Sequence, residues 1–270
     1  MTISLVSIHI YPVKALGGIS LAQSLVTPRG LQHDRRFMVV DANDAFLTQR
    51  DHPKMATVWV EIENGEVSFS APDIESISFS ATPNELPARN VQVWASVVRA
   101  YAVSPGVDQW LSDYLGIDAR LVYMPDSAER RINPDYAHHN EIVSFADGYP
   151  LLIASQASLD DLNARITGSG GQAVPMNRFR PNLVIAGCGA YAEDQLGDIV
   201  IGEAAFRAVK PCIRCQVPTT DQASGVVRGP EPLQTLATYR DSGNGVMFGM
   251  NLIPLTLGTV RVGDVVSLPR

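Results

Sequence analysis

The sequence predicts a mainly β protein with a few helices, an α+β fold made of two β-rich units. Short runs in which apolar and polar residues alternate recur along the chain, and turn-forming residues separate them. Three segments carry the apolar spacing of an amphipathic helix. The chain has 270 residues, 46% of them apolar, which suits one large domain or two small ones. We place the border near residues 104–120 and divide the chain into residues 1–115 and 116–270.

The N-terminal unit is predicted to be a small β-barrel or sandwich. Its runs are rich in β-branched residues and alternate with period two. The expected strands are residues 3–12, 36–41, 57–63, 67–71 and 91–102. The sequence Glu63-Asn64-Gly65 lies between two of them and predicts a hairpin turn, because Asn and Gly tolerate a positive φ.

The first helix is predicted at residues 107–115, at the end of this unit. Val107, Trp110 and Leu111 fall on one face of a helix with 3.6 residues per turn. Gly116 follows directly, and glycine commonly ends a helix because it adopts a left-handed conformation without strain.

The C-terminal unit is predicted to combine strands with two helices. Ser155 is suited to cap a helix that closes in the glycine-rich residues 168–171, and a second helix is expected at residues 232–240. The polar residues 125–140 are expected to form a surface loop. The strands expected in this unit are residues 120–124, 151–154, 182–186, 198–201, 205–209, 247–253 and 259–268.

Charge and hydropathy exclude several classes of protein. There are 21 basic and 28 acidic residues, a net charge of −7, and without a dense basic stripe nucleic acid is not an expected partner. No run approaches the roughly 18 apolar residues of a membrane span. Residues 1–14 alternate like a strand and lack the features of an export signal. With only three cysteines, we expect a protein of the reducing cytoplasm.

The segment from Lys210 to Asp221 concentrates reactive groups, and Pro211 and Pro218 predict that it is a loop. Cys212 and Cys215 fit a zinc half-site poorly, because further soft ligands at matching spacing are missing. A thioredoxin-like dithiol would open a helix, which the following residues do not favour. Two interpretations remain: one thiolate is a metal or cofactor ligand, or both cysteines are inert core residues.

Basic residues form two further clusters. Arg178 and Arg180 lie two residues apart and, on an extended chain, would point to one face as a doubled grip for a phosphate or carboxylate. The alternative is a pair of surface arginines that form ion pairs with nearby acidic residues. Lys14 and Arg35 belong to an isolated concentration of positive charge and predict an anion pocket, with solvated surface charge as the alternative. Asp147 precedes a glycine and is a candidate proton donor or acceptor, or a residue that merely caps a turn.

Together these segments resemble the MOSC family, specifically its members with an additional N-terminal β-barrel domain. Relatives of this kind include the mitochondrial amidoxime-reducing component and bacterial reductases that detoxify hydroxylaminopurines. The resemblance covers nearly the whole chain and implies an N-terminal MOSC β-barrel domain followed by a MOSC β-barrel domain. The matching motifs are Tyr11-Pro12-Val13-Lys14, Gly30-Leu31, Asp34-Arg35-Arg36-Phe37, Leu47-Thr48-Gln49-Arg50, Phe179-Arg180-Pro181-Asn182, Tyr191-Ala192-Glu193-Asp194, residues 212–220, Phe248-Gly249-Met250-Asn251 and Val262-Gly263-Asp264.

The resemblance implies a molybdenum cofactor, the pyranopterin molybdopterin with its metal. In the family a cysteine at the position of Cys215 ligates molybdenum, whereas Cys212 matches a neighbouring thiol that is not the ligand. Ala15 and Asn251 replace the serine and tyrosine of the amidoxime-reducing proteins, which leaves room for a different substrate. The cofactor contacts implied besides Cys215 are Lys14, Arg35, Arg180, Asn182, Arg214 and Asn251.

The expected function is the two-electron reduction of small N-hydroxylated compounds, namely hydroxylamines, amidoximes or N-hydroxylated bases. Asp147 is the expected proton donor. Electrons are expected from a separate flavoprotein or ferredoxin-type partner, because no further cysteines follow for an iron–sulfur domain. Two alternatives stay open: a sulfur carrier with a persulfide on a cysteine, and a cofactor-binding protein without turnover.

Overall fold

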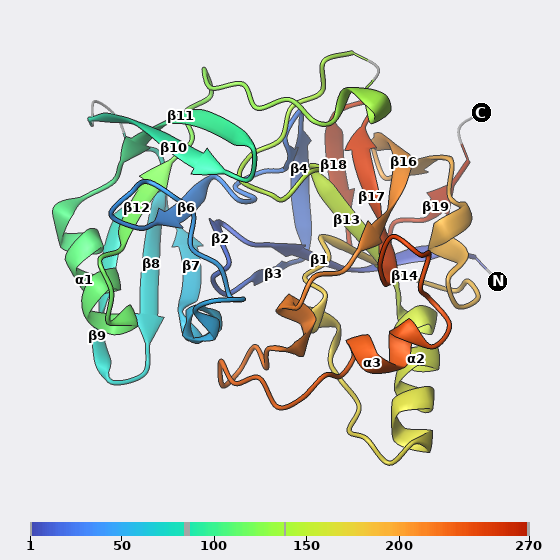
Figure 1. The fold of residues 1–270 in the computed structure, drawn as a ribbon. Helices are drawn as coiled ribbons and strands as arrows, with labels where there is room; N and C mark the ends of the chain where they lie inside the picture. The colour runs from blue at the N-terminus through green and yellow to red at the C-terminus, as the bar shows by residue number, and fades with distance from the viewer. Residues whose placement is uncertain (1, 84–86, 138, 269–270) are drawn as a thin grey trace.

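Two β-rich units lie side by side in the computed structural model, which describes residues 2–83, 87–137 and 139–268 (Figure 1). The N-terminal unit, mostly blue to green, lies at the left of Figure 1, and the C-terminal unit lies at the right. Strands dominate both units, so the mainly β architecture predicted from the sequence is confirmed. No helix within these residues is long and apolar enough to cross a membrane.

A curled eight-stranded sheet forms the framework of the C-terminal unit. Its strands, in spatial order, are β19 (Val266–Ser267), β15 (Asp198–Ile201), β16 (Ala204–Ile213), β17 (Met247–Pro254), β13 (Leu151–Ser155), β14 (Leu183–Ala186), β1 (Ser4–Ile10) and β3 (Ile19–Leu21). Leu5, Ile153, Phe206 and Leu252 have no exposed surface and belong to the core of this unit. Burial of such side chains is the main force that holds the strands in register.

A three-stranded sheet adds to this unit: β18 (Gly258–Arg261), β4 (Gln23–Thr27) and β5 (Gly30–Leu31). β4 lies between the other two strands and is antiparallel to both. The core side chains Val26 and Val260, one from β4 and one from β18, are buried together with those of the larger sheet. Strands from the two ends of the chain therefore share one core.

Two sheets and a helix build the N-terminal unit. The first sheet has the order β10 (Ala88–Val93), β11 (Ser96–Ala102), β12 (Arg120–Tyr123), β6 (Phe37–Val40), β2 (Val13–Lys14), and the second has the order β7 (Trp59–Glu63), β8 (Glu66–Ala71), β9 (Ile74–Ser80). Helix α1 (Pro105–Leu115) buries Trp110 against Phe69, with ring centroids 5.9 Å apart. It ends at Gly116, whose φ of 73° confirms the predicted stop.

Strand pairing crosses the predicted boundary between residues 115 and 116 in both directions. β1 and β3 belong to the sheet of the C-terminal unit, where Leu5 of β1 pairs with Ile185 of β14. β12 lies after the boundary but pairs with β6 and β11 of the N-terminal unit. The boundary itself stays a prediction.

Two predicted strands are each divided by a turn. Residues 91–102 lie on β10 and β11 of a hairpin, with Trp94 at the turn and a φ of 54°. No Gly or Asn marks this turn in the sequence, so a single strand was the wrong prediction. Residues 259–268 are divided between β18 and β19, with Gly263 at a φ of 97° between them.

The segment that carries the cysteines is only partly a loop. β16 continues through Pro211 to Ile213, so the prediction of a loop from Lys210 onward is wrong for its first residues. The register of β16 against β17 shifts between Pro211 and Ile213, and proline is tolerated in a strand at such an irregularity. Beyond β16 the chain leaves the sheet, and a 3₁₀ helix follows at Val217–Thr219.

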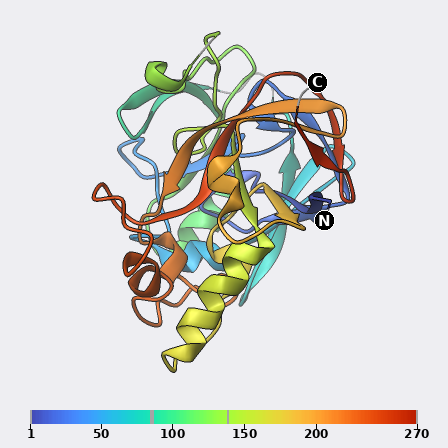
Figure 2. The ribbon, with the colours of Figure 1, turned by 90° about the vertical axis from the view of Figure 1, so that its right-hand side faces the viewer.

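Helix α2 (Gln156–Gly168) contacts β13 and β14 and projects downward from the C-terminal unit in both ribbon views (Figure 1 and Figure 2). The side chain of Ser155 accepts a hydrogen bond from the backbone N–H of Ser158, so the predicted cap is confirmed. The short helix α3 (Leu233–Ala237) packs against α2 and occupies only part of the predicted residues 232–240.

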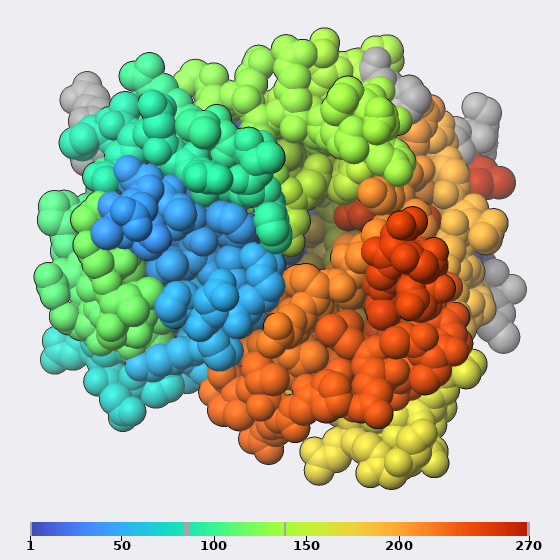
Figure 3. All heavy atoms as spheres, in the orientation of Figure 1, coloured from blue at the N-terminus to red at the C-terminus, as the bar shows by residue number. Residues whose placement is uncertain are grey.

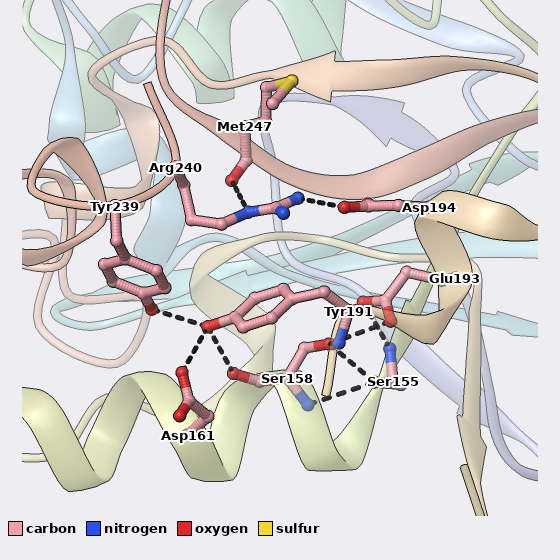
Figure 4. Close-up of polar contacts among 9 residues, drawn as sticks. All are labelled: Ser155, Ser158, Asp161, Tyr191, Glu193, Asp194, Tyr239, Arg240 and Met247. Carbon is pink, nitrogen blue, oxygen red and sulfur yellow. Dashed lines mark hydrogen bonds and ion pairs between the residues drawn. The ribbon is translucent and has the colours of Figure 1, made fainter. Parts of the chain in front are cut away.

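A buried polar network fastens α2 to the chain segment that follows β14 (Figure 4). The carboxylate of Glu193, which has no exposed surface, accepts hydrogen bonds from Ser155 N at 3.1 Å and Ser158 Oγ at 2.8 Å. The hydroxyl of Tyr191 donates to Asp161 and lies 2.5 Å from the hydroxyl of Tyr239. These mutual hydrogen bonds join α2 to the segment after β14 and favour one packing of α2 over others.

Candidate functional site

A cleft between the two units brings together the predicted catalytic and cofactor-binding residues. In the space-filling view it is the hollow between the blue-to-teal surface and the orange surface (Figure 3). About 840 Å³ of space, part of it open to solvent, lies within it. The predicted residues that line it are Lys14, Arg35, Asp147, Arg180, Asn182, Arg214, Cys215 and Asn251.

Lys14 is a buried cation of the N-terminal unit that reaches a carboxylate of the C-terminal unit. It ends β2, which is parallel to β6, and only 8% of the residue is exposed. Its Nζ donates a hydrogen bond to Asp147 Oδ1. The same oxygen accepts a second hydrogen bond, from Trp94 Nε1 at 3.0 Å. Arg130 Nη2 donates to the backbone oxygen of Asp147 at 2.6 Å and so fixes the loop that carries the carboxylate.

The pKa values of both groups lie below their ordinary values, but for different reasons. Burial lowers the pKa of Lys14, and the charge of Asp147 opposes that shift only in part. Desolvation by itself would raise the pKa of Asp147, but the charge and hydrogen bond of Lys14, with the hydrogen bond of Trp94, hold it well below its ordinary value. The carboxyl of Asp147 is therefore ionised at neutral pH.

Two guanidinium groups pack against one buried aromatic ring. The guanidinium carbons of Arg35 and Arg180 lie 4.2 and 4.1 Å from the ring centroid of Tyr11. Arg35 Nη1 donates to both carboxylate oxygens of Asp34, at 2.8 and 2.7 Å. A pair of cations this close to each other is favourable only with aromatic and anionic partners around it.

Arg180 is the less satisfied of the two guanidinium groups. Its Nη1 donates to Gln222 Oε1 at 3.3 Å, whereas its Nη2 is buried and has no hydrogen-bond partner within the described residues. Burial lowers the pKa of Arg180 to about 10, and the nearby charge of Arg35 adds to this shift. A buried, unpartnered N–H of a cation at a cleft marks a place for an anionic acceptor.

Asn182 supports the site through bonds to the protein itself. Its Nδ2 donates to the backbone oxygen of His9 at 3.1 Å, and its Oδ1 accepts from Arg35 Nη1 and the backbone N–H of Leu152, each at 3.1 Å. The side chain thus joins β1 to β13 and orients Arg35. The amide of Asn251 likewise donates to the backbone oxygen of Lys210 at 3.0 Å.

Cys212 and Cys215 differ in their surroundings. Cys212 lies on β16, half-buried, and its Sγ is 3.0 Å from Nη1 of Arg214. Cys215 follows the end of β16, is exposed and lines the cleft, so it is not an inert core residue. Arg214 also donates to the backbone oxygen of Phe179 at 2.8 Å, and its Nε is buried without a partner in the described part of the chain. Cys188, the third cysteine, packs against the core of the C-terminal unit.

The described residues offer no protein site for a metal ion that is held by several side chains. No group of three or more His, Cys, Asp or Glu is gathered suitably within them. A metal at Cys215 would therefore need most of its ligands from a bound cofactor, and a soft thiolate suits a soft metal centre.

The predicted pairing of Arg178 with Arg180 on one face is wrong. Residues Met176–Arg178 form a 3₁₀ helix and Arg180 has a φ of 55°, so this segment is not extended. Arg178 instead donates to the backbone oxygen of Thr219 at 3.0 Å and pairs with Asp221 at 2.9 Å. It fixes the chain beyond Cys215, whereas Arg180 alone faces the cleft.

Several lining residues received no individual role from the sequence. Gln49 lines the cleft and exchanges two amide hydrogen bonds, at 3.1 and 2.9 Å, with Gln222 of the C-terminal unit. Phe46 and Arg50 line the N-terminal side and Tyr149 the C-terminal side. Their partners lie far away in sequence, and the motif Leu47-Thr48-Gln49-Arg50 was the one signal that pointed to this region.

The cleft therefore combines an exposed thiol with several cations and few anions. Such a site is suited to an anionic ligand that also presents a thiolate-binding atom. Its two walls come from different units, so the ligand would be enclosed by residues far apart in the chain.

Comparison with known proteins agrees with this arrangement. Residues 2–118 match the model of the MOSC N-terminal beta barrel domain, and residues 140–267 match that of the MOSC domain. The chain is 31% identical to mitochondrial amidoxime reducing component 2 of Rattus norvegicus, over 95% of this chain and 80% of that protein. It is 30% identical to mitochondrial amidoxime-reducing component 1 of Homo sapiens, over 96% and 81%.

A third relative is molybdenum cofactor sulfurase of Oryza sativa subsp. japonica. It is 32% identical over 268 residues, which make up 93% of this chain but 32% of that protein. Because two domain models together span most of the chain and the relatives align along nearly all of it, the protein belongs to the MOSC family, in the group with an N-terminal MOSC β-barrel domain.

Proposed function

We propose that this protein binds a molybdenum cofactor and reduces small N-hydroxylated compounds. The observation that carries the proposal is a pair of buried guanidinium nitrogens, Arg180 Nη2 and Arg214 Nε, which have no hydrogen-bond partner among the described residues and belong to side chains that line the same cleft as Cys215. An anionic pterin phosphate supplies the acceptors that such donors lack. The names of the amidoxime-reducing relatives supply the reaction class.

Each predicted residue has a place in this proposal. Cys215 would hold the metal, while Lys14, Arg35, Arg180 and Arg214 would neutralise and grip the rest of the cofactor. Asn182 and Asn251 would contact it or hold the cations and strands that do. When bound, the cofactor would supply the two electrons that, together with two protons taken up from solvent, convert the N–O bond of the substrate into an N–H bond and water.

Asp147 is the proposed proton-transfer residue. Its side chain is 65% exposed at the cleft, so it is accessible to solvent, and it is paired with the ammonium of Lys14. Because its pKa is held low, it would not store a proton at neutral pH but would accept one and pass it on. Electrons would come from a separate flavoprotein or ferredoxin-type partner.

The two cysteines give a direct test. We expect Cys215→Ala to remove bound molybdenum and hydroxylamine reduction together, because the thiolate is the one protein ligand proposed for the metal. Cys212→Ala is the matched control, because Cys212 precedes Arg214 whereas Cys215 follows it. This variant should retain most of the bound molybdenum and most of the activity. Molybdenum content and turnover are measured on protein from a host that makes the cofactor. Equal losses in the two variants, or none, would refute the assignment.

A sulfur-carrier function is the second candidate, because the chain aligns with molybdenum cofactor sulfurase over 93% of its length and Cys215 is exposed. Intact-mass measurement of protein that is free of molybdenum separates the two. A stable adduct of one sulfur atom on Cys215 would favour the carrier. If the protein binds the cofactor but reduces no N-hydroxylated compound with either a flavin or a ferredoxin reductase as electron donor, it is a cofactor-binding protein without turnover.

A further inference from the structure

Trp94 lies at the tip of the hairpin formed by β10 and β11 and contacts residues that line the cleft, although it is not itself one of the lining residues. Its Nε1 donates to Asp147 Oδ1 at 3.0 Å. Its ring lies 5.1 Å from the ring of Phe46, and the guanidinium carbon of Arg50 lies 4.7 Å from the indole centroid. Asp147, Phe46 and Arg50 all line the cleft, so Trp94 contacts its wall at three points.

The backbone of Trp94 is unfavourable for its own turn. Val93 pairs with Ser96, so Trp94 and Ala95 form a two-residue loop, and Trp94 has a φ of 54°. Glycine is the residue favoured at positive φ in the first position of such loops, and a bulky side chain there is strained. The turn gains nothing from this tryptophan, so the reason for it lies in what the side chain contacts.

The indole ring is held in place and still accessible. Its one polar atom is satisfied by Asp147, and Phe46 and Arg50 restrict its motion, yet 42% of the residue is exposed. A ring that is already ordered loses little conformational entropy when a ligand stacks on it. Flat conjugated ligands gain from such stacking, whereas small non-aromatic ones do not.

We propose that Trp94 is a substrate-recognition residue that selects flat, conjugated N-hydroxylated compounds beside the cleft. The inference rests on the proposed function and refines it, because it assigns the preference for one shape of substrate to one side chain. It also places the bound ring beside Asp147, the residue to which the indole donates.

The test measures equilibrium binding of benzamidoxime, a flat aromatic amidoxime, to the cofactor-loaded protein with no electron donor supplied. Trp94→Gly relieves the positive φ and removes the ring, and we expect it to weaken binding by about 3- to 10-fold. Trp94→Phe keeps a stacking ring without the Nε1 donor and should stay within about 2-fold of the unaltered protein. Trp59→Phe is the matched control, since this tryptophan is 51% exposed on β7 and, unlike Trp94, its indole has no hydrogen bond, ring contact or cation contact with a cleft-lining residue in the described part of the chain.

The outcomes are distinct from those of the proposed function. The inference is overturned if Trp94→Gly binds benzamidoxime as tightly as the unaltered protein does. It is also overturned if Trp94→Phe weakens binding as much as Trp94→Gly does, because the effect would then belong to the hydrogen bond of Nε1 and not to the ring. Melting temperatures show that each variant is folded. In a second arm with an electron donor, the ratio of kcat/KM for benzamidoxime to that for hydroxylamine should fall in Trp94→Gly. If neither the unaltered protein nor any variant reduces either compound, the proposed function fails. The binding measurement still decides the role of Trp94.

Discussion

The cleft concentrates positive charge within a protein whose net charge is −7. Arg35, Arg180 and Arg214 reach it from three different segments, and Asp34 neutralises only the first of them directly. Desolvation is the largest cause of the raised pKa of Tyr11, so this phenol stays neutral between two guanidinium groups. An excess of cations that the protein itself does not balance is what an anionic cofactor would complete.

The ion pair of Lys14 and Asp147 predicts how stability depends on pH. The pKa of Asp147 in the folded protein lies below its ordinary value of 3.8, so the unfolded chain binds more protons than the folded one at acidic pH. The stabilisation by this carboxylate is present above the ordinary pKa and is lost as the pH falls below it. In Asp147→Asn the buried ammonium of Lys14 loses its counter-charge, which costs on the order of 1 kcal/mol at neutral pH.

Melting temperatures of the unaltered protein and Asp147→Asn, taken from neutral pH down through 3.8, test this. We expect the gap between the two to be widest at neutral pH and to narrow in acid. Asp126→Asn serves as control, because its carboxylate pairs with Arg36 while 88% exposed, and exposed pairs contribute little. Two curves that stay parallel over the whole range would show that Asp147 does not stabilise the fold in its ionised form.

Among the elements, α2 and the segment after β14 hold the strands behind the cleft. The 3₁₀ helix Ala192–Gln195 contacts both β13 and β17, which contribute Leu152 and Asn251 to the cleft. Glu193 of that helix is the buried acceptor for Ser155 and Ser158 (Figure 4). This network therefore supports the site without touching it.

Glu193→Ala tests the network. Removing the carboxylate leaves the backbone N–H of Ser155 and the hydroxyl of Ser158 short of an acceptor, and we expect a loss of about 3 kcal/mol in the free energy of unfolding. Urea unfolding measures it. Glu193→Gln, which keeps one acceptor oxygen, should lose less, and Asp160→Ala on the exposed side of α2 should change little. A Glu193→Ala protein as stable as the Asp160→Ala control would contradict the assigned role.

The elements also show what the sequence could predict. α1 and α2 were predictable because their signals are local: the apolar face with Trp110, the stop at Gly116 and the cap at Ser155. β2, with two residues, is too short for any alternation to be recognised. The turn at Trp94 escaped prediction because the residue there contradicts the turn's usual chemistry.

The sequence was sufficient to predict which residues belong to the cleft, but not the contacts that their side chains make. The motifs pointed to Lys14, Arg180 and Cys215, and all three line one cavity. What each atom contacts depends on long-range packing, as with the amide pair of Gln49 and Gln222, which are 173 positions apart. The proposed roles of these residues remain predictions that the variants above test.

At the scale of the whole molecule, the two units share strands and therefore should not fold separately. Residues 1–115 lack β12, which lies between β11 and β6 in the sheet of the N-terminal unit. Residues 116–270 lack β1, which pairs with β14 and buries Leu5 and Ile8 in the core of the C-terminal unit. Each fragment would expose unpaired strand edges and apolar surface that the whole chain buries.

We therefore expect calorimetry of the whole chain to give one unfolding transition with matching calorimetric and van't Hoff enthalpies. The separate fragments 1–115 and 116–270 should lack the dispersed amide spectra of folded domains, and mixing them should restore those spectra if the strands recombine. A fragment that unfolds cooperatively alone, or two resolved transitions in the whole chain, would contradict this expectation. Since the walls of the cleft come from both units, the binding of a cofactor should raise the temperature of the single transition and not divide it.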